Sequence, residues 1–521
     1  MVAKPKGLST ESRVIDSNID SSTDSEWSPE QWLEKMHTQL GKQSELTEAS
    51  DMNTLETFSW SLTDLQQSVD GEWIGAMDSD STVTFTSIST DSRSLQPGGL
   101  YIAIKGEHFD GHQFISQAVK QGAVAVLVSE VVDSVVPGVL VDDTRIALGE
   151  FAKWHRQQMP VKKLIAVTGS NGKTTTKSLL LNIFQNVGHT LATEGNLNND
   201  FGVPRTLLNL RLEHEYAIIE MGANHRGEIA YLTNLALPDI ALITNASDAH
   251  LEGFGSLQGI IETKGGIYQG LNQMGSDKAG VAIMNTDSNG YLDWLKMTEE
   301  LGIQRVVRFG SQADAEVAVS DLTVTETGIR FTLTFNGLTH SVEMPVLGEH
   351  NAFNAAASVA VALNAGLTWQ QILPGLTSFT GVAGRLQKQK IATGWLIDDS
   401  YNANPASVKA GINTLVSLPG LSILCLGAMA ELGEGSLAAH QDIAEYAKQQ
   451  GVDYLFVFGE ATLPMIEKFG KQSKYFDSHE VLAQKVAKIL AEQQQLNLNA
   501  NVLIKGSRSA RMEEISNCLL L

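Results

Sequence analysis

The sequence predicts an α/β protein built on largely parallel β-sheets and divided into about three domains. The chain has 521 residues, enough for about three domains of ordinary size. Hydrophobic residues make up 43% of it and only 12 residues are Pro, a composition typical of globular proteins. From about Phe58 onward, short β-rich runs alternate with longer helical stretches, which predicts βαβ units in more than one domain.

Ten apolar, β-branched runs are predicted as strands, and the clearest helix is expected over residues 176–187. The strands are expected at residues 100–104, 123–128, 164–167, 217–219, 240–244, 280–284, 395–397, 422–426, 454–458 and 501–504. Ligands of parallel sheets bind beyond the carboxyl ends of the strands. Unusual polar residues just after a strand are therefore the first candidates for a functional site.

Charge and cysteine content exclude several classes of function. The net charge of −22 argues against non-specific binding to nucleic acid, because phosphate backbones are held mainly by Lys and Arg. Two cysteines, Cys425 and Cys518, are too few for a disulfide framework and have no metal-ligand spacing, so we expect a reducing, cytoplasmic setting. No apolar run approaches the roughly 18 residues of a membrane span, and the first 30 residues lack a signal-peptide pattern. We therefore expect neither membrane insertion nor export by that route.

Residues 1–57 are predicted to be a disordered acidic extension, because they are rich in Ser, Thr and acidic residues with little hydrophobic pattern. One stretch, residues 28–41, begins with a capping-box spacing and continues with apolar residues at helical spacing. A transient helix is the favoured interpretation of this stretch. The alternative is a helix, or a whole extension, that docks to a protein partner.

The strongest single motif is a phosphate-binding loop. The predicted strand 164–167 leads into Gly169, Ser170, Asn171 and Gly172, followed by Lys173, Thr174 and Thr175 at the start of a helix. A Gly-rich turn at a helix N-terminus directs backbone N–H groups at an anion. Lysine at this place neutralises terminal phosphates, and the first threonine hydroxyl suits Mg²⁺. The loop is two residues shorter between its glycines than the common form, yet it predicts nucleotide binding.

Polar residues after the neighbouring strands are candidates for metal and nucleotide contacts. Glu220, at the end of the strand 217–219, is placed to hold a hard cation. His250 follows the strand 240–244, where a ligand role and a structural role are equally good explanations. Lys264 by itself suggests only a solvated helix lysine. Asn351 and Asn354 share one face of a helix, where they could read a nucleobase edge or serve helix capping.

Taken together, these motifs resemble the Mur ligases, the ATP-dependent amide-forming enzymes of peptidoglycan precursor synthesis. The resemblance runs from about residue 58 to near the C-terminus. It is carried by GNLNN at 195–199, EMGANH at 220–225, AHLEGFG at 249–255, GEHNAFN at 348–354, DDSYNAN at 398–404, AELG at 430–433 and KGSRS at 505–509. The DDSYNAN run resembles the corresponding motif of one branch of the family. That branch adds D-alanyl-D-alanine to UDP-N-acetylmuramoyl-tripeptide through an acyl phosphate, so the resemblance implies this reaction.

The family architecture implies three domains after the extension at 1–57. These are a small α/β UDP-binding domain at 58–143, a central P-loop ATPase domain with a mostly parallel sheet at 144–380, and a C-terminal Rossmann-like domain at 381–521. The stretches STDSR at 89–93 and YIAIKG at 101–106 match the family's UDP-binding segments. Ser92, Arg93 and Lys105 are the implied contacts, with the two cations facing a diphosphate.

Residue by residue, the resemblance also implies roles in the central and C-terminal domains. Lys173 would hold phosphates, Thr174 and Glu220 one Mg²⁺, and His250 a second, while Lys264 matches a lysine that the family carbamylates into an oxygen ligand. Lys173, Glu220, His250 and Lys264 form the implied catalytic set. Asn351, Asn354, Arg385 and Asp399 are implied ATP contacts, and Asn196, Asn198, Asn199, Tyr401, Asn402 and Asn404 are implied substrate contacts.

The sequence departs from the family at two places and leaves alternatives open. The usual Gly-Asp-Met is GAM at 427–429, and the usual Lys-Gly-Glu is KGG at 264–266. One alternative is a sibling ligase that adds a single amino acid, or a folylpolyglutamate-type synthase. Another is a P-loop nucleotide-binding protein without ligase activity. We further expect a monomer that uses ATP and two Mg²⁺ ions, with no nucleic-acid partner.

Overall fold

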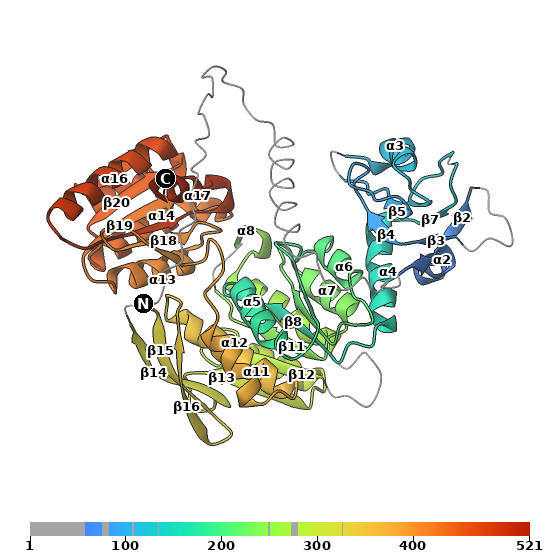
Figure 1. The fold of residues 1–521 in the computed structure, drawn as a ribbon, viewed down its shortest axis with the longest axis horizontal. Coiled ribbons are helices and arrows are strands. Elements are labelled where there is room, and N and C mark those ends of the chain that lie inside the picture. Colours follow the sequence, from blue (N-terminus) through green and yellow to red (C-terminus); the bar gives the residue numbers. More distant parts are fainter. Residues whose placement is uncertain are drawn as a thin grey trace, which may run out of the picture. The chain divides into compact units, whose positions relative to one another are not determined.

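The computed structural model describes residues 58–75, 83–106, 109–133, 135–247, 251–271, 280–325 and 327–520, apart from the side chains of 251 and 252. The predicted extension at 1–57, its helical stretch at 28–41, and His250 lie outside the described residues. Within them the chain forms three β-sheets of five or more strands, each with helices packed against it (Figure 1). No described helix is long and apolar enough to cross a membrane.

The first sheet belongs to residues 72–140 and has the strand order β2-β7-β6-β5-β4. Its strands pair in parallel except for β2 against β7. The elements of this region are β1 (Trp60–Ser61), α2 (Leu62–Val69), β2 (Glu72–Ile74), β3 (Thr84–Phe85), β4 (Ser87–Ser89), β5 (Gly99–Ile102), η1 (Gly111–Phe114), α3 (Ile115–Lys120), β6 (Ala125–Val128), β7 (Gly138–Leu140) and α4 (Thr144–Gln158). The small β1-β3 ladder is separate from this sheet.

The central sheet has nine strands in the order β16-β15-β14-β13-β12-β11-β8-β10-β9. The strands are β8 (Lys163–Thr168), β9 (Thr190–Ala192), β10 (Tyr216–Glu220), β11 (Ile240–Ile243), β12 (Val281–Asn285), β13 (Arg305–Gly310), β14 (Val317–Val324), β15 (Ile329–Phe335) and β16 (Leu338–Met344). The ladder is parallel from β9 to β14 and antiparallel from β14 to β16. From β8 the chain continues to β9 and β10 on one side and then to β11 on the other, so β8 ends at a topological switch point, where ligands of such sheets bind.

Two hydrophobic clusters cover the two faces of the central sheet. One includes Leu164 and Ala166 of β8, and the other includes Ile165 and Val167 of the same strand. The helices of this region are α5 (Lys173–Phe184), α6 (Gly202–Leu207), α7 (Glu228–Ala236), α8 (Leu251–Phe254), α9 (Leu257–Gly265), η2 (Gly266–Gly270), α10 (Tyr291–Glu300), α11 (His350–Asn364) and α12 (Trp369–Thr377). Because both faces are covered, β8, β10, β11 and β12 are continuous apolar runs and were predicted, whereas the shorter or partly exposed β9, β13 and β14 were not.

The third sheet, residues 387–505, has the order β17-β18-β22-β19-β20-β21 and is parallel except for β17 against β18. Its elements are β17 (Gln387–Lys390), β18 (Trp395–Asp399), α13 (Pro405–Val416), β19 (Leu421–Gly427), η3 (Gly433–Gly435), α14 (Ser436–Gln449), β20 (Tyr454–Phe458), η4 (Glu460–Thr462), α15 (Pro464–Phe469), β21 (Ser473–Phe476), α16 (His479–Gln495), β22 (Ala500–Lys505), η5 (Arg508–Ala510) and α17 (Glu513–Leu520). It too has a cluster of buried residues on each face.

Each of the ten predicted strands overlaps an observed one, and the architecture of mostly parallel sheets is confirmed. The helix predicted over 176–187 begins three residues earlier, at Lys173, because Gly172 adopts a left-handed conformation with φ of 81° and starts the helix immediately. The hairpin of β15 and β16 was not predicted. It turns at Asn336 and Gly337, which both have positive φ.

Candidate active site

The phosphate loop lies between β8 and α5, as the sequence predicted. Helix α5 begins at Lys173 without a side-chain cap, which leaves N–H groups of its first turn for an anion. The Lys173 ammonium folds back and donates to the carbonyl oxygens of Gly169 at 2.7 Å and Ser170 at 3.4 Å. Burial lowers the pKa of Lys173, and the nearby Glu220 carboxylate opposes that shift.

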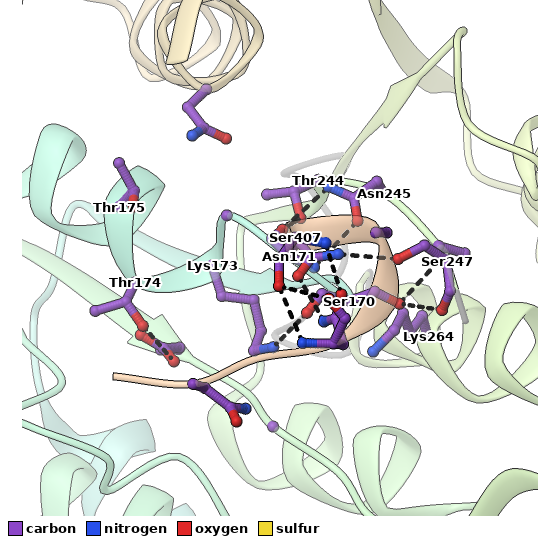
Figure 2. A pocket seen from close by; sticks show the side chains of 18 of the residues that line it. Ser170, Asn171, Lys173, Thr174, Thr175, Thr244, Asn245, Ser247, Lys264 and Ser407 are labelled. Carbon is purple, nitrogen blue, oxygen red and sulfur yellow. Dashed lines mark hydrogen bonds between the residues drawn. The ribbon is translucent and has the colours of Figure 1, made fainter. Parts of the chain in front are cut away.

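The segment after β11 braces the loop from one side (Figure 2). The Thr244 hydroxyl donates to the Asn171 carbonyl at 2.6 Å, and the Asn245 side-chain oxygen accepts from the Asn171 N–H at 3.1 Å. The Ser170 hydroxyl donates to the carbonyl of Ser247 at 3.0 Å, and the Asn171 amide donates to the Ser247 hydroxyl at 2.9 Å. The loop conformation is therefore set by side chains before any ligand arrives.

Both loop glycines are required by close approaches. A Cβ at Gly169 would lie 1.8 Å from the Thr244 hydroxyl oxygen. A Cβ at Gly172 would lie 2.6 Å from the Asn354 side-chain oxygen, and the positive φ there would be strained as well.

Glu220 ends β10 beside the loop and is 2% exposed. One of its oxygens, Oε1, accepts from the Thr174 hydroxyl at 3.1 Å and from the Asn198 amide at 2.9 Å. The other oxygen, Oε2, is buried and has no hydrogen bond among the described residues, and the Lys177 ammonium is 3.9 Å away. A buried, under-satisfied carboxylate oxygen beside a threonine hydroxyl fits a hard cation such as Mg²⁺.

Lys264, on α9, is 4% exposed, and no described residue accepts a hydrogen bond from its ammonium. The centroid of the Phe254 ring lies 6.0 Å from the Lys264 Nζ atom. Burial lowers the pKa of Lys264 well below its ordinary value, and the charge of Lys173 adds to the shift. The solvated-lysine interpretation is therefore wrong, because the side chain is buried and burial disfavours its charged form.

Arg385 and Tyr401 come from the third-sheet region and reach the same place. The Arg385 guanidinium donates to the Thr174 hydroxyl at 2.9 Å and lies 4.3 Å from the centroid of the Tyr401 ring. The Thr174 hydroxyl thus donates to Glu220 and accepts from Arg385. This arrangement places a positive charge beside the first turn of α5.

Asn404 and Asp399 lie on the same wall. Asn404 caps α13 through its side-chain oxygen and donates its amide to the Asn171 oxygen at 2.8 Å. Asp399, at the end of β18, accepts from the Lys505 ammonium at 2.6 Å and from the Leu386 N–H at 3.2 Å. Asn404 therefore contacts the phosphate loop directly, whereas Asp399 is held by its own region.

The two helix amides are used in packing. The Asn351 amide donates to the carbonyl of Leu347 at 2.7 Å, and the Asn354 amide donates to the Asn351 side-chain oxygen at 2.9 Å. The Asn354 oxygen accepts from the Thr176 hydroxyl at 3.3 Å, which ties α11 to α5. These bonds are packing contacts and not the helix cap that the sequence allowed, because α11 has Glu349 as its N-cap residue and no side-chain cap. A contact with adenine stays a prediction.

A cavity of about 1010 Å³ brings most of the predicted residues together. Its walls include Ser170, Asn171, Gly172, Lys173, Thr174, Thr175, Asn196, Asn198, Asn199, Glu220, Lys264, Asn351, Asn354, Arg385, Asp399, Tyr401, Asn402 and Asn404. A volume of this size suits a large polar ligand or two ligands side by side.

The predicted UDP contacts lie apart from this cavity wall. Ser92 is buried, Arg93 makes an exposed ion pair with Asp91 at 2.8 Å, and Lys105 pairs with Glu130. Exposed pairs of this kind hold their side chains weakly and release them at little cost. Their role in binding a diphosphate stays a prediction.

Sequence reasoning missed several residues of the site. Thr244, Asn245 and Ser247 follow β11 at a strand end, and that position was the signal that could have identified them. Lys505 stands in a motif that was noticed but given no role. Arg145 and Asp200 carry no local signal, because only the fold brings them onto the cavity wall.

Comparison with known proteins agrees with this geometry. The Mur ligase family catalytic domain matches residues 84–156, the Mur ligase middle domain residues 167–362, and the Mur ligase glutamate ligase domain residues 384–508. The fold and the site thus define a ligase of three α/β domains, and the chain belongs to the Mur ligase family.

Several relatives that are at least 28% identical carry the name of one ligase. The chain is 42% identical to the UDP-N-acetylmuramoyl-tripeptide–D-alanyl-D-alanine ligase of Escherichia coli (strain K12) over 460 residues, covering 88% of this chain and 98% of that one. A crystal structure of MurF from Acinetobacter baumannii is 33% identical, with a TM-score of 0.82 over 89% of this chain and 100% of that one. A second structure from that organism, with a TM-score of 0.78 and 33% identity over 90% and 100% of the two chains, is named as a ligase of the 2,6-diaminopimelate-containing tripeptide. The MurF ligase of Thermotoga maritima, solved with ADP, is 28% identical, with a TM-score of 0.73 over 83% and 96% of the chains.

Proposed function

We propose that the chain joins D-alanyl-D-alanine to the terminal carboxylate of UDP-N-acetylmuramoyl-tripeptide, converting ATP to ADP and phosphate and yielding the pentapeptide precursor of peptidoglycan. The observation that carries this proposal is a single cavity wall with three parts. These are the phosphate loop, the buried Glu220 carboxylate with one oxygen that has no hydrogen bond among the described residues, and polar side chains of the third-sheet region. The 42% sequence identity to a UDP-N-acetylmuramoyl-tripeptide–D-alanyl-D-alanine ligase favours this reaction over three alternatives. These are a ligase that adds a single amino acid, a folylpolyglutamate-type synthase, and a nucleotide-binding protein without ligase activity.

The first chemical step activates the carboxylate of the tripeptide. A carboxylate oxygen forms a bond to the γ-phosphorus of ATP, and the bond from that phosphorus to the bridging oxygen of ADP breaks. Lys173 and the N–H groups at the start of α5 stabilise negative charge on the transferred group, and Arg385 adds charge from the other side. The remaining residues of the loop, Gly169 to Thr175, position the phosphates.

In the second step the neutral amine of D-alanyl-D-alanine attacks the acyl carbon. The C–N bond forms, the C–O bond to phosphate breaks, and the proton lost by the amine leaves with the phosphate as hydrogen phosphate. We assign Asn196, Asn198, Asn199, Tyr401, Asn402 and Asn404 to the two peptide substrates, and Asn351, Asn354, Arg385 and Asp399 to ATP. Support for this comes from their shared cavity, in which the Asn198 amide already contacts the Glu220 carboxylate at 2.9 Å.

Mg²⁺ fits the residues present. Thr174 and Glu220 would hold one ion, and Lys264 would contribute after its neutral amine adds CO₂ and loses a proton to become a carbamate. His250 is the remaining proposed ligand, to a second ion. No group of three or more His, Cys, Asp or Glu suited to a metal occurs among the described residues, which agrees with an ion that keeps waters and phosphate oxygens as ligands. When bound, Mg²⁺ neutralises charge on the phosphates.

The remaining assignments complete the proposal. Residues 58–143 bind the UDP moiety through Ser92, Arg93 and Lys105, residues 144–380 bind ATP, and residues 381–521 close the site. We assign the reaction to the cytoplasm and to a monomer. Each sheet with its covering helices supports one of the three structured parts.

The decisive experiment measures phosphate release by the full chain with ATP, Mg²⁺, UDP-N-acetylmuramoyl-tripeptide and D-alanyl-D-alanine. Lys173→Ala is expected to lower kcat by at least about 100-fold, because a preorganised charge at the reacting phosphate is lost. Lys488→Ala, on the exposed face of α16, is the matched control and should retain full activity. Equal activity of Lys173→Ala and wild type, or turnover with a single amino acid in place of the dipeptide, would overturn the proposal.

A further inference from the structure

Two ion pairs of the described residues have both partners on the cavity wall. One is Lys505 with Asp399, which is buried in the third-sheet region. The other is Arg145 with Asp200, which is more open, with side chains 53% and 25% exposed. An exposed ion pair alone contributes little to stability. A charged pair kept on the wall of a substrate cavity needs a second explanation.

The pair lies on the side of the cavity formed by the loop from residue 196 to residue 200. Asn198 of this loop donates to Glu220, the proposed metal carboxylate, and Asp200 follows two residues later. Two residues of chain span at most about 7 Å. Arg145 comes from the first turn of α4 and contacts Asp200 across this edge. A group bound by the pair would therefore lie close to the carboxylate that is being activated.

The other cations of the wall are already occupied or assigned. Lys173 donates to loop carbonyls, Arg385 donates to Thr174, and Lys505 donates to Asp399. Lys264 is 4% exposed and is assigned to the metal site as a carbamate. Arg145 is also paired, with Asp200, but its side chain is 53% exposed, and it is the exposed Lys or Arg side chain of this wall among the described residues.

The chemistry of the pair selects a particular kind of ligand. A simple anion would be attracted by Arg145 and repelled by Asp200. The pair has no net charge, so it would bind such an anion only weakly. A zwitterion with an ammonium and a carboxylate on one carbon satisfies both partners, because each charged group of the ligand replaces one half of the protein pair.

We propose that Arg145 and Asp200 form the subsite for the second amino-acid end of a diaminopimelate residue at the third position of the tripeptide. This inference rests on the proposed function. Diaminopimelate has two amino-acid ends separated by three methylene groups. One end bears the carboxylate that is activated near Glu220, and the other presents its ammonium to Asp200 and its carboxylate to Arg145. A lysine at the same position would offer only an ammonium.

Other parts of the substrates fit the pair less well. The amine of D-alanyl-D-alanine is the nucleophile and must be free of Asp200, and its carboxylate lies a whole dipeptide away. The diphosphate of UDP and a free carboxylate elsewhere in the peptide are plain anions without a partner for Asp200. Each of these occupants gives a different result in the following test.

The test compares two substrates, UDP-N-acetylmuramoyl-tripeptides with diaminopimelate or with lysine at the third position. Arg145→Ala is expected to lower kcat/KM about 10- to 100-fold for the diaminopimelate substrate, the loss of one charged hydrogen-bonding partner, and to change it less than about twofold for the lysine substrate. The change should appear in KM for the UDP substrate. Arg145→Lys should recover part of the loss, and Asp200→Asn should weaken both substrates.

The controls separate this inference from the proposed function. Arg330→Ala removes a similarly exposed ion pair, with Glu343 at 2.9 Å on β15, away from the cavity wall, and should leave both substrates unaffected. An equal loss with both substrates after Arg145→Ala, a rise in KM for D-alanyl-D-alanine instead, or full activity after Asp200→Asn would overturn the subsite. A wild-type chain that turns over neither tripeptide would overturn the proposed function itself.

Discussion

The central sheet and the third sheet both place charged side chains at the carboxyl ends of neighbouring parallel strands, yet they treat those charges in opposite ways. At the end of β10, the Glu220 oxygen Oε2 is buried without a hydrogen bond among the described residues, and the Lys177 ammonium lies 3.9 Å from it. At the ends of β18 and β22, Asp399 and Lys505 are 2.6 Å apart, and Lys505 also donates to the carbonyl of Asn402 at 2.9 Å.

The difference separates a site that is prepared for ligands from one that is complete by itself. A buried polar group without partners costs free energy, so its persistence at a strand end points to a ligand that supplies the partner. A buried pair with all its partners stabilises the local structure and fixes the orientation of the wall. Mutations at the first edge should therefore lower activity without loss of stability, whereas mutations of the Asp399–Lys505 pair should lower stability in addition to any effect on ATP binding.

The largest effect on stability is expected from Lys505→Met. Removing the lysine leaves the Asp399 carboxylate buried without its counter-charge, which should lower the free energy of unfolding by about 3–5 kcal/mol. Thermal and urea unfolding of the full chain would measure it.

The double variant Lys505→Met with Asp399→Leu serves as the control, because it removes both charges together. It should recover most of the lost stability. If the single variant unfolds like wild type, Lys505 does not hold Asp399 and the distinction between the two edges fails.

Lys264→Met should have the reverse signature. The pKa of Lys264 is lower in the folded chain than in the unfolded chain. Above the unfolded pKa both states are neutral at this residue and it has no effect, but as the pH falls the unfolded chain binds a proton more readily. At neutral pH the lysine therefore lowers the free energy of unfolding. The variant is expected to be at least as stable as wild type while kcat falls about 100-fold or more, because an oxygen ligand is lost.

Bicarbonate provides an independent readout for the same residue. In CO₂-depleted buffer, added bicarbonate should raise the activity of wild type and leave Lys264→Met unchanged. A variant that is much less stable than wild type, or a wild type indifferent to bicarbonate, would contradict this assignment.

A smaller effect on stability is expected from His155, a buried histidine whose two ring nitrogens both have hydrogen-bond partners when the ring is neutral. The Trp60 indole donates to Nδ1 at 3.0 Å, so Nε2 carries the hydrogen and donates to the carbonyl of Leu210 at 3.0 Å. Burial lowers the pKa of His155 from 6.5 to about 4, opposed by the bond to Leu210. Between these two values the unfolded chain binds a proton that the folded chain does not. The free energy of unfolding should therefore fall as the pH falls through this window, by up to roughly 3 kcal/mol.

Comparing the pH dependence of unfolding for wild type and His155→Gln isolates this contribution, since glutamine can both accept and donate without titrating. His189→Gln, at an exposed histidine, should retain the wild-type slope. Identical slopes for wild type and His155→Gln would show that the ring is not held neutral.

The sequence was most informative where a single local rule decides the structure. Buried parallel strands are continuous apolar runs, so β8, β10 and β11 were predicted within one or two residues. The phosphate loop was predicted because its spacing and its glycines are tied to one geometry. The β15–β16 hairpin was not predicted, because its strands alternate polar and apolar residues and contain no continuous apolar run. Asn336-Gly337 between them is nevertheless a strong turn signal.

The remaining site residues depend on tertiary pairing. Lys264 was interpreted as solvated because its neighbours in sequence say nothing of its burial, which results from the packing of α9. Asn404 meets Asn171 across 233 positions in the chain, and Arg385 meets Thr174 across 211. Arg145 and Asp200 meet only because α4 passes the loop after β9. No local pattern encodes such contacts, so only a family resemblance or the structure could identify them.

The two loop glycines have a consequence for how this protein can diverge. Side chains at Gly169 and Gly172 are barred by Thr244 and Asn354, which belong to the protein rather than to the nucleotide. A related protein that had lost catalytic activity would still need both glycines, because side chains at these positions would clash with its own Thr244 and Asn354. Glycines at these two positions would therefore persist in an inactive paralogue, and they are a poor criterion for deciding whether a sequence of this kind is still an enzyme.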